Sequence, residues 1–160
     1  MDTPPKKRDT LVLKERILVV TLIVMAALFL YLRWSNGRMD RVDVSVGNAT
    51  VRAEVAETIG QHERGLSGRE KLGENEGMLF VFGTPDRYPF WMKEMRFPID
   101  IIWINGGKVV DITRNLPSPL SGEIPASAFP SVPVTHVLEV NAGFTDLQGI
   151  TIGDEIRIQS

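Results

Sequence analysis

The chain has 160 residues, of which 43% are hydrophobic and 24% charged, so it is long enough for one folded domain and lacks the composition of a disordered protein. It contains no cysteine, which excludes disulfides, thiolate nucleophiles and thiolate metal sites. Six basic and three acidic side chains lie before residue 34, whereas twelve basic and seventeen acidic side chains follow, so nucleic-acid binding by the folded part is not expected.

The N-terminal part of the chain predicts a membrane anchor. Residues 1–10 are polar and carry two prolines, which indicates a disordered tail. An uninterrupted apolar run then extends from Ile17 to Leu32, and roughly 17 to 25 such residues cross a bilayer. We therefore expect a transmembrane anchor over residues 11–34 and a linker over residues 35–41. The alternative is a cleaved signal peptide, but no cleavage site rich in small residues follows the run.

The flanking charges predict the orientation of this anchor. Five basic side chains precede the apolar run, against three in the first ten residues after it. Because the more basic flank stays in the cytoplasm, the N-terminus is expected inside. The sequence thus predicts a single-pass protein whose domain, residues 42–160, lies outside in the periplasm or at the cell surface.

The first half of this domain predicts a pair of strands, then a helix and then a third strand. Residues 41–46 and 50–56 alternate apolar and polar side chains, which predicts a hairpin. Residues 57–71 have apolar groups at helical spacing, so we expect a helix that breaks near Gly65 or Gly68. Residues 78–82 predict a buried strand that ends in a turn at residues 83–86.

The second half is expected to centre on one buried hairpin. Residues 90–97 mix apolar and charged side chains on both faces of a strand, as at the rim of a core. Residues 99–104 predict a central strand, which the turn Asn105-Gly106-Gly107 joins to a return strand at 109–113.

Beyond this hairpin, five prolines between residues 115 and 133 indicate a loop. The remaining segments predict a strand at 134–140, a helical turn at 142–148 and a last strand at 155–158.

Asp100 is the exception in the central strand, where it lies among isoleucines and a tryptophan. An unpaired buried charge costs several kcal/mol, so this carboxylate is expected to be exposed, paired or bonded to backbone N–H groups. Lys93 and Arg96 are its nearest candidate partners along the chain.

Five segments carry a resemblance to a known family: ERGLSGRE (63–70), GMLFVF (77–82), FWMKEMRFPIDIIWI (90–104), HVLEVNAG (136–143) and GITIGDEI (149–156). Over residues 42–158 the chain resembles domain of unknown function 192, also called uncharacterised protein family 127. The resemblance implies a small α+β domain with a strongly bent, barrel-like mixed sheet and one or two short helices, often secreted or anchored by one N-terminal segment. It implies no activity, cofactor or catalytic residue.

The chain departs from the family pattern at three positions. Many relatives have Asn-Thr where this chain has Glu94 and Met95, and many have Met where it has Ser67. A role that depends on those groups in the relatives is therefore not transferred to this chain.

A non-enzymatic binding or accessory module at the cell envelope is the first functional hypothesis, with a small ligand or an envelope protein as partner. Aromatic planes beside charged groups at the rim of a sheet are typical of ligand pockets. The alternative is that the aromatic side chains belong to the core and the charges pair with one another. The candidate ligand-binding residues are Tyr88, Trp91, Lys93, Glu94, Arg96 and Asp100.

Two other hypotheses remain open. An envelope hydrolase would need two carboxyl groups across one cleft. Its candidates are Glu63, Glu76, Glu94, Asp100 and Glu139. A copper site would use soft ligands. Its candidates are Met78, Met92 and Met95 with His62 or His136. Strand geometry would point Met92 and Met95 to opposite faces, which disfavours that site, and no cofactor is expected.

Overall fold

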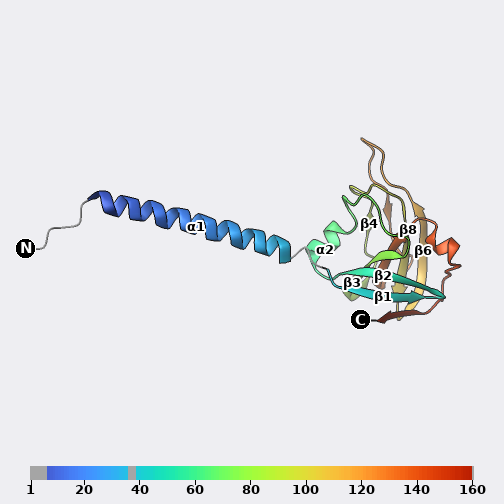
Figure 1. Ribbon diagram of the computed structural model, residues 1–160. Helices are drawn as coiled ribbons and strands as arrows, with labels where there is room; N and C mark the ends of the chain where they lie inside the picture. The colour runs from blue at the N-terminus through green and yellow to red at the C-terminus, as the bar shows by residue number, and fades with distance from the viewer. Residues whose placement is uncertain (1–6, 36–38, 160) are drawn as a thin grey trace, which may run out of the picture. The chain divides into compact units, whose positions relative to one another are not determined.

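The computed structural model describes residues 7–35 and 39–159 (Figure 1). The chain divides into two compact units, Met1–Met39 and Asp40–Ser160. Residues 1–6 of the predicted tail and residues 36–38 of the predicted linker lie outside the described residues.

The first unit contains helix α1 (Lys7–Ser35). The predicted disordered tail is wrong for residues 7–10, because the helix already begins at Lys7 and no proline or glycine follows to interrupt it. Twelve large apolar side chains between Leu13 and Leu30 are 54–66% exposed. Consecutive helical residues lie about 100° apart, so these side chains cover every side of the helix. Across residues 7–35 and 39–159, none of the helices combines the length and the apolar character that a membrane crossing needs.

The second unit is a β-rich domain built on a seven-stranded mixed sheet with the order β6-β5-β8-β3-β2-β1-β9. Its strands are β1 (Arg41–Val46), β2 (Ala49–Ala56), β3 (Glu76–Asp86), β5 (Ile99–Asn105), β6 (Lys108–Leu116), β8 (Val134–Asn141) and β9 (Ile156–Gln159). A ribbon of β4 (Phe90–Trp91) and β7 (Ser127–Ala128) and the short helices α2 (Ile59–Arg64) and α3 (Phe144–Leu147) complete the domain. Strands β2 and β3 are parallel, and the other neighbours in the sheet are antiparallel.

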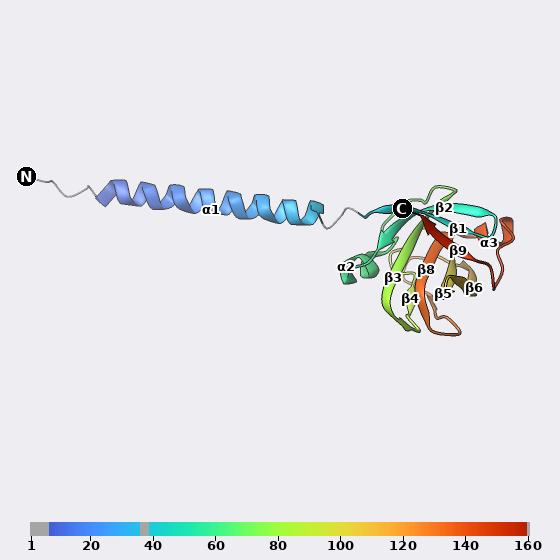
Figure 2. The same cartoon turned by 90° about the horizontal axis from the view of Figure 1, so that it is seen from below.

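The sheet curls until its two outermost strands approach each other (Figure 2). Lys108 of β6 forms a β-bridge with Glu155, the residue before β9. Beside this bridge, the backbone N–H of Ile156 donates to the carbonyl of Gly107 over 2.8 Å. The domain is therefore a curled half-barrel, which agrees with the bent mixed sheet that the family resemblance implies.

The hydrophobic core fills the concave side of this half-barrel. Alternate residues of each strand point to opposite faces, so Leu79, Ile102 and Leu138 point into the core while Phe80, Trp103 and Glu139 belong to the other face. We call the two sides the inner and the outer face. This inner-face cluster consists of Val44, Val46, Ala49, Val51, Ala53, Leu79, Ile102, Ile104, Val109, Leu138, Val140, Phe144, Ile150 and Ile156. Further apolar side chains are buried on the outer face, among them Met78, Phe80, Ile101, Trp103 and Val137.

Most of the predicted elements are present. The opening hairpin is β1 and β2, and the central hairpin is β5 and β6. The turn of the central hairpin needs glycine, since Gly106 and Gly107 have φ angles of 59° and 72°. Helix α2 ends before Gly65, as the helix break in the sequence predicts. The strand at 134–140, the helical turn at 142–148 and the last strand correspond to β8, α3 and β9.

Three predicted segments differ from the structure. The turn at 83–86 is wrong, because β3 continues through a register shift until Asp86 pairs with Val134. Within residues 90–97 only β4 is a strand; the chain then turns, with the N–H of Met95 donating to the carbonyl of Met92. The loop at 115–133 contains β7, which forms because its backbone pairs with β4.

Candidate functional site

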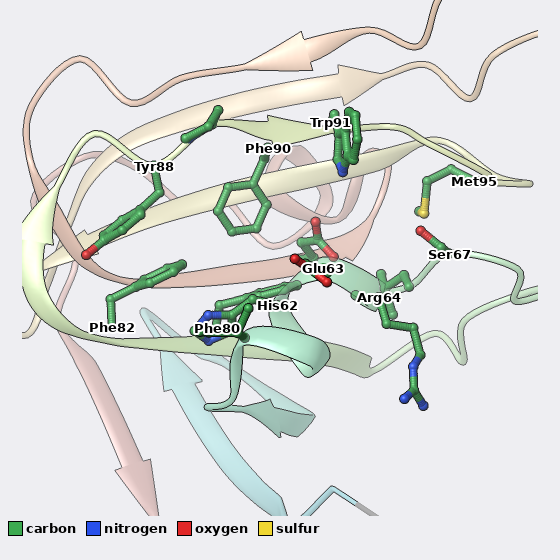
Figure 3. A pocket seen from close by; sticks show the side chains of 15 residues that line it. His62, Glu63, Arg64, Ser67, Phe80, Phe82, Tyr88, Phe90, Trp91 and Met95 are labelled. Atoms are coloured by element: carbon green, nitrogen blue, oxygen red, sulfur yellow. The ribbon is translucent and has the colours of Figure 1, made fainter. Parts of the chain in front are cut away.

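A pocket of about 350 Å³ opens on the outer face of the sheet, between α2, β3 and β4 (Figure 3). Its lining consists of Ile59, His62, Glu63, Arg64, Gly65, Leu66, Ser67, Phe80, Phe82, Tyr88, Pro89, Phe90, Trp91, Met95 and Glu139. Most of these side chains come from the connection between β2 and β3 and from the segment that leads into β4. The pocket thus lies on the opposite face of the sheet from the core.

Helix α2 forms one wall and is held at both ends by local sequence. Thr58 and Gln61 form a capping box, in which the Thr58 hydroxyl accepts from the N–H of Gln61 and the Gln61 side chain accepts from the N–H of Thr58. At the other end Gly65 has a φ angle of 48°, and a Cβ there would approach the Phe80 ring to 3.3 Å. Glycine therefore both ends the helix and lets it lie close to β3.

Aromatic rings form most of the surface of the pocket. Phe82 stacks on Tyr88 with 3.7 Å between ring centroids, and Phe80 meets Phe90 edge-on at 4.8 Å. The His62 ring lies 4.7 Å from that of Phe82, and its Nε2 is hydrogen-bonded to the carbonyl of Ala56. Figure 3 shows the Phe82–Tyr88 stack at one end of the pocket and Trp91 toward the other.

Glu139 is the buried polar group of this pocket. It lies on β8, where it pairs across the sheet with Met78 of β3 and Ile101 of β5. Its side chain is 7% exposed, and no hydrogen-bond partner for its Oε2 exists in the part of the chain that the structure describes. Burial raises the pKa of Glu139 to about 8, against the opposing effect of the Arg69 charge. At neutral pH this carboxyl group is therefore mostly protonated.

Arg69 is a cation whose charge acts on Glu139, but its side-chain hydrogen bonds go to another carboxylate. Its guanidinium donates to both carboxylate oxygens of Glu54 on β2. These hydrogen bonds, more than any other effect, lower the pKa of Glu54. A second guanidinium, from Arg41, also donates to Glu54 over 2.9 Å. Glu54 thus has two cationic partners, whereas among the described residues Glu139 has no cationic partner within hydrogen-bond distance.

The structure brings two of the six predicted ligand-binding residues into the pocket. Tyr88 and Trp91 line it, and Trp91 is 58% exposed at the edge of β4. Lys93 does not line the pocket; its Nζ lies 5.3 Å from the centre of the Trp91 ring, which is cation–π distance.

The other three predicted residues have structural contacts outside the pocket. Glu94 is exposed in a turn with a φ angle of 57°, and its carbonyl accepts from the N–H of Gly68. Arg96 forms an ion pair with Glu70. Asp100 is fully buried and accepts from the backbone N–H groups of Asn115, Gly143 and Thr145, which is one of the three alternatives expected for its carboxylate. Among the described residues, neither Lys93 nor Arg96 pairs with it.

The structure brings only some of the hydrolase candidates together. Glu63 and Glu139 line the same pocket, whereas Glu76, Glu94 and Asp100 do not, and the hydrolase stays a prediction.

For the copper site, the argument from strand geometry is wrong, because Met92 and Met95 lie in a turn and are both buried. Among the described residues, no three His, Asp or Glu side chains are grouped to hold a metal ion. The soft-metal site, which would depend on methionine, stays a prediction.

Sequence reasoning named His62 only as a candidate copper ligand and did not select Phe80 or Phe82, although all three line the pocket. They come from a helix and a strand whose contact is tertiary, and no motif marks that contact. The position of Glu139, in contrast, could be recognised as unusual from the sequence. Like Asp100, it is a lone carboxyl group inside an apolar strand, in the segment HVLEV.

Comparisons with known proteins show the family and the fold of the domain. The family model of domain of unknown function 192, described as uncharacterized ACR, matches residues 42–158. A protein of unknown function from Novosphingobium aromaticivorans DSM 12444 has a similar structure, with 32% identity, a TM-score of 0.66 and coverage of 76% of this chain and 87% of that one.

A second similar structure is that of a Sinorhizobium meliloti 1021 protein, provisionally named a transcription regulator. It has 30% identity, a TM-score of 0.68 and coverage of 75% of this chain and 95% of that one. Among curated proteins, none matches this chain. The family match and the two structures together show that the chain belongs to the domain of unknown function 192 family.

Proposed function

We propose that the domain is a binding module that takes a small ligand with a largely apolar body into the outer-face pocket. One observation carries this proposal: a buried carboxyl group with an unpartnered oxygen lies in a cavity whose surface is mostly aromatic. An unsatisfied buried polar atom costs about 1–3 kcal/mol, and a bound ligand that pairs with it would remove that cost. The volume of about 350 Å³ falls in the usual range for small-molecule sites.

A role in binding nucleic acid is not proposed for this domain, whatever the name of the Sinorhizobium relative. After residue 33 the chain has seventeen acidic and twelve basic side chains, so its overall charge repels phosphate.

Binding is tested by a thermal-shift screen of the full-length protein against envelope sugars, peptides, amines and nucleotides. A ligand at one hundred times its dissociation constant should stabilise the fold by about 2.7 kcal/mol. Trp91→Ala should remove this shift and leave the unliganded melting temperature nearly unchanged, because Trp91 is 58% exposed.

Phe129→Ala is the matched control for this screen. Phe129 has the same exposure of 58% but does not line the pocket, so this variant should keep the full shift. If no ligand shifts the melting temperature, or if both variants respond alike, the pocket is not the binding site.

We also propose that residues 17–32 attach the protein to a membrane, with the N-terminus in the cytoplasm and the domain at the envelope. The support is the exposure of apolar side chains on all sides of α1, which is unfavourable in water. The full-length protein should remain in the membrane fraction after alkaline washing, and a protease added outside should digest the domain. Release of the intact protein into the soluble fraction would contradict membrane attachment, and protection of the domain would contradict the orientation.

A further inference from the structure

The polar groups that the pocket offers to a ligand are acidic or electron-rich. Glu139 lies in the pocket with an unpartnered oxygen, and Glu63 adds a second carboxyl group from α2. The faces of aromatic rings carry partial negative charge, and five aromatic side chains apart from His62 line the cavity. Such a set of groups attracts positive charge.

The cationic side chains near the pocket are engaged or directed away from it. Arg69 donates to both oxygens of Glu54, and Lys93 lies against the Trp91 ring rather than in the lining. Arg64 belongs to the lining, but its guanidinium group points away from the aromatic rings (Figure 3). An anionic ligand would therefore meet carboxyl groups without a facing cation.

A neutral ligand is also disfavoured relative to a cation of the same shape. A neutral hydrogen-bond acceptor could pair with the protonated Glu139, but it would gain nothing from Glu63 or from the charge distribution of the rings. An ammonium group gains from all three, because hydrogen bonds between ions are about twice as strong as neutral ones. Cation–π contacts in a desolvated site add further stabilisation.

We propose that the pocket binds a small organic cation, an alkylammonium or arylalkylammonium compound, whose apolar body lies among Phe82, Tyr88 and Trp91 and whose ammonium group donates to Glu139. This inference rests on the proposed binding function and specifies the ligand class of the same site. The only covalent bond that breaks in this step is the O–H bond of the Glu139 carboxyl group. The Glu139 carboxyl group gives its proton to the solvent as the ammonium group takes its place.

The binding of such a cation should depend on pH through Glu139. The titratable and charged groups that face it are Arg69, with Glu54 bound to it, and His62, Glu63 and Arg64 of the pocket. An alkylammonium group, like the lysine side chain, stays protonated up to about pH 10. Affinity should therefore rise with pH up to about 8, where Glu139 ionises without help from the ligand.

The test compares three probes of one shape on the full-length protein at pH 7 by titration calorimetry. They are 2-phenylethylammonium, its neutral analogue 2-phenylethanol, and the anion 3-phenylpropionate. The ammonium should bind about tenfold tighter than the alcohol, and the carboxylate should not bind. Heats measured in two buffers of different ionisation enthalpy should show release of close to one proton per bound ammonium.

Glu139→Gln should weaken ammonium binding by about tenfold or more and abolish the proton release. Glu74→Gln removes one exposed carboxyl group outside the pocket and controls for the change in net charge, so it should leave both quantities unaltered.

Three outcomes would overturn the inference. Tighter binding of the alcohol or the carboxylate would refute the cationic ligand while leaving the binding function intact. Ammonium binding without proton release, or with full affinity in Glu139→Gln, would refute the role of Glu139. Absence of binding by all three probes would also refute the ligand class, and the binding function would then be decided separately by the ligand screen with Trp91→Ala.

Discussion

Replacing Asp100 by alanine should lower the free energy of unfolding by about 3–5 kcal/mol. The Asp100 carboxylate accepts four hydrogen bonds, from the N–H groups of Asn115, Gly143 and Thr145 and from the Thr145 hydroxyl over 2.7 Å. Alanine would leave these buried donors without an acceptor, and each unsatisfied donor costs about 1–3 kcal/mol, part of which water entering the site recovers. Chemical unfolding of the full-length protein, followed by tryptophan fluorescence, measures the loss.

Thr145→Val is the matched control for Asp100→Ala. It removes only the hydroxyl donor and keeps the backbone N–H, so it should cost about 1–2 kcal/mol. The hydrogen bonds of the Asp100 carboxylate join β5 to α3, which none of the backbone pairings of the sheet does. Equal losses in the two variants would show that the backbone hydrogen bonds to Asp100 contribute little.

Replacing Glu139 by glutamine should have the opposite effect and raise the free energy of unfolding by about 3 kcal/mol at pH 7. The folded-state pKa of Glu139 is about 8, whereas the unfolded value is near 4.5. Between these pH values Glu139 is protonated in the folded protein and ionised in the unfolded chain. The free energy of unfolding of the native protein therefore falls as pH rises. Each pH unit above 4.5 lowers the free energy of unfolding by about 1.4 kcal/mol, until the carboxyl group ionises in the folded state as well.

The pH dependence distinguishes this mechanism from a general improvement in packing. Glutamine does not titrate, so the gain should vanish near pH 4.5 and grow through pH 7. Unfolding curves at both pH values check this, with Glu74→Gln as an exposed control that should show no such trend. A difference in stability that is the same at both pH values would contradict the raised pKa. A residue that costs this much stability is of the kind that function retains at the expense of the fold.

The strands of the domain could be predicted because their signals are local. Apolar and polar side chains alternate in β1 and β2, β5 is apolar except for Asp100 and its last residue, Asn105, and glycines mark the turn of the central hairpin. The predictions failed where pairing with a distant strand decides the structure. β3 continues to Asp86 through its pairing with β8, and β7 exists through its pairing with β4.

The candidate site could be predicted only in part, for the same reason. Trp91 and Tyr88 could be selected because aromatic side chains beside charges at a rim are conspicuous in the sequence. The opposite wall depends on α2 packing over β3, which brings His62 against Phe82 at 4.7 Å. Lys93, Glu94 and Arg96 were selected by proximity along the chain, but the turn after β4 directs them away from the pocket lining. Only the tertiary fold decides which of these side chains line the pocket and which point away from it.

The pocket and the hydrophobic core occupy opposite faces of the same strands. Phe80 and Glu139 line the pocket, while their neighbours Leu79, Leu138 and Val140 fill the core. A substitution on one face therefore leaves the packing on the other nearly intact, since alternate side chains of a strand do not touch. Exposed lining residues such as Ile59 and Trp91 could thus be exchanged one at a time to shift ligand preference while the scaffold keeps its shape, whereas Phe80 and Phe90 are themselves buried and contribute to the packing of the outer face.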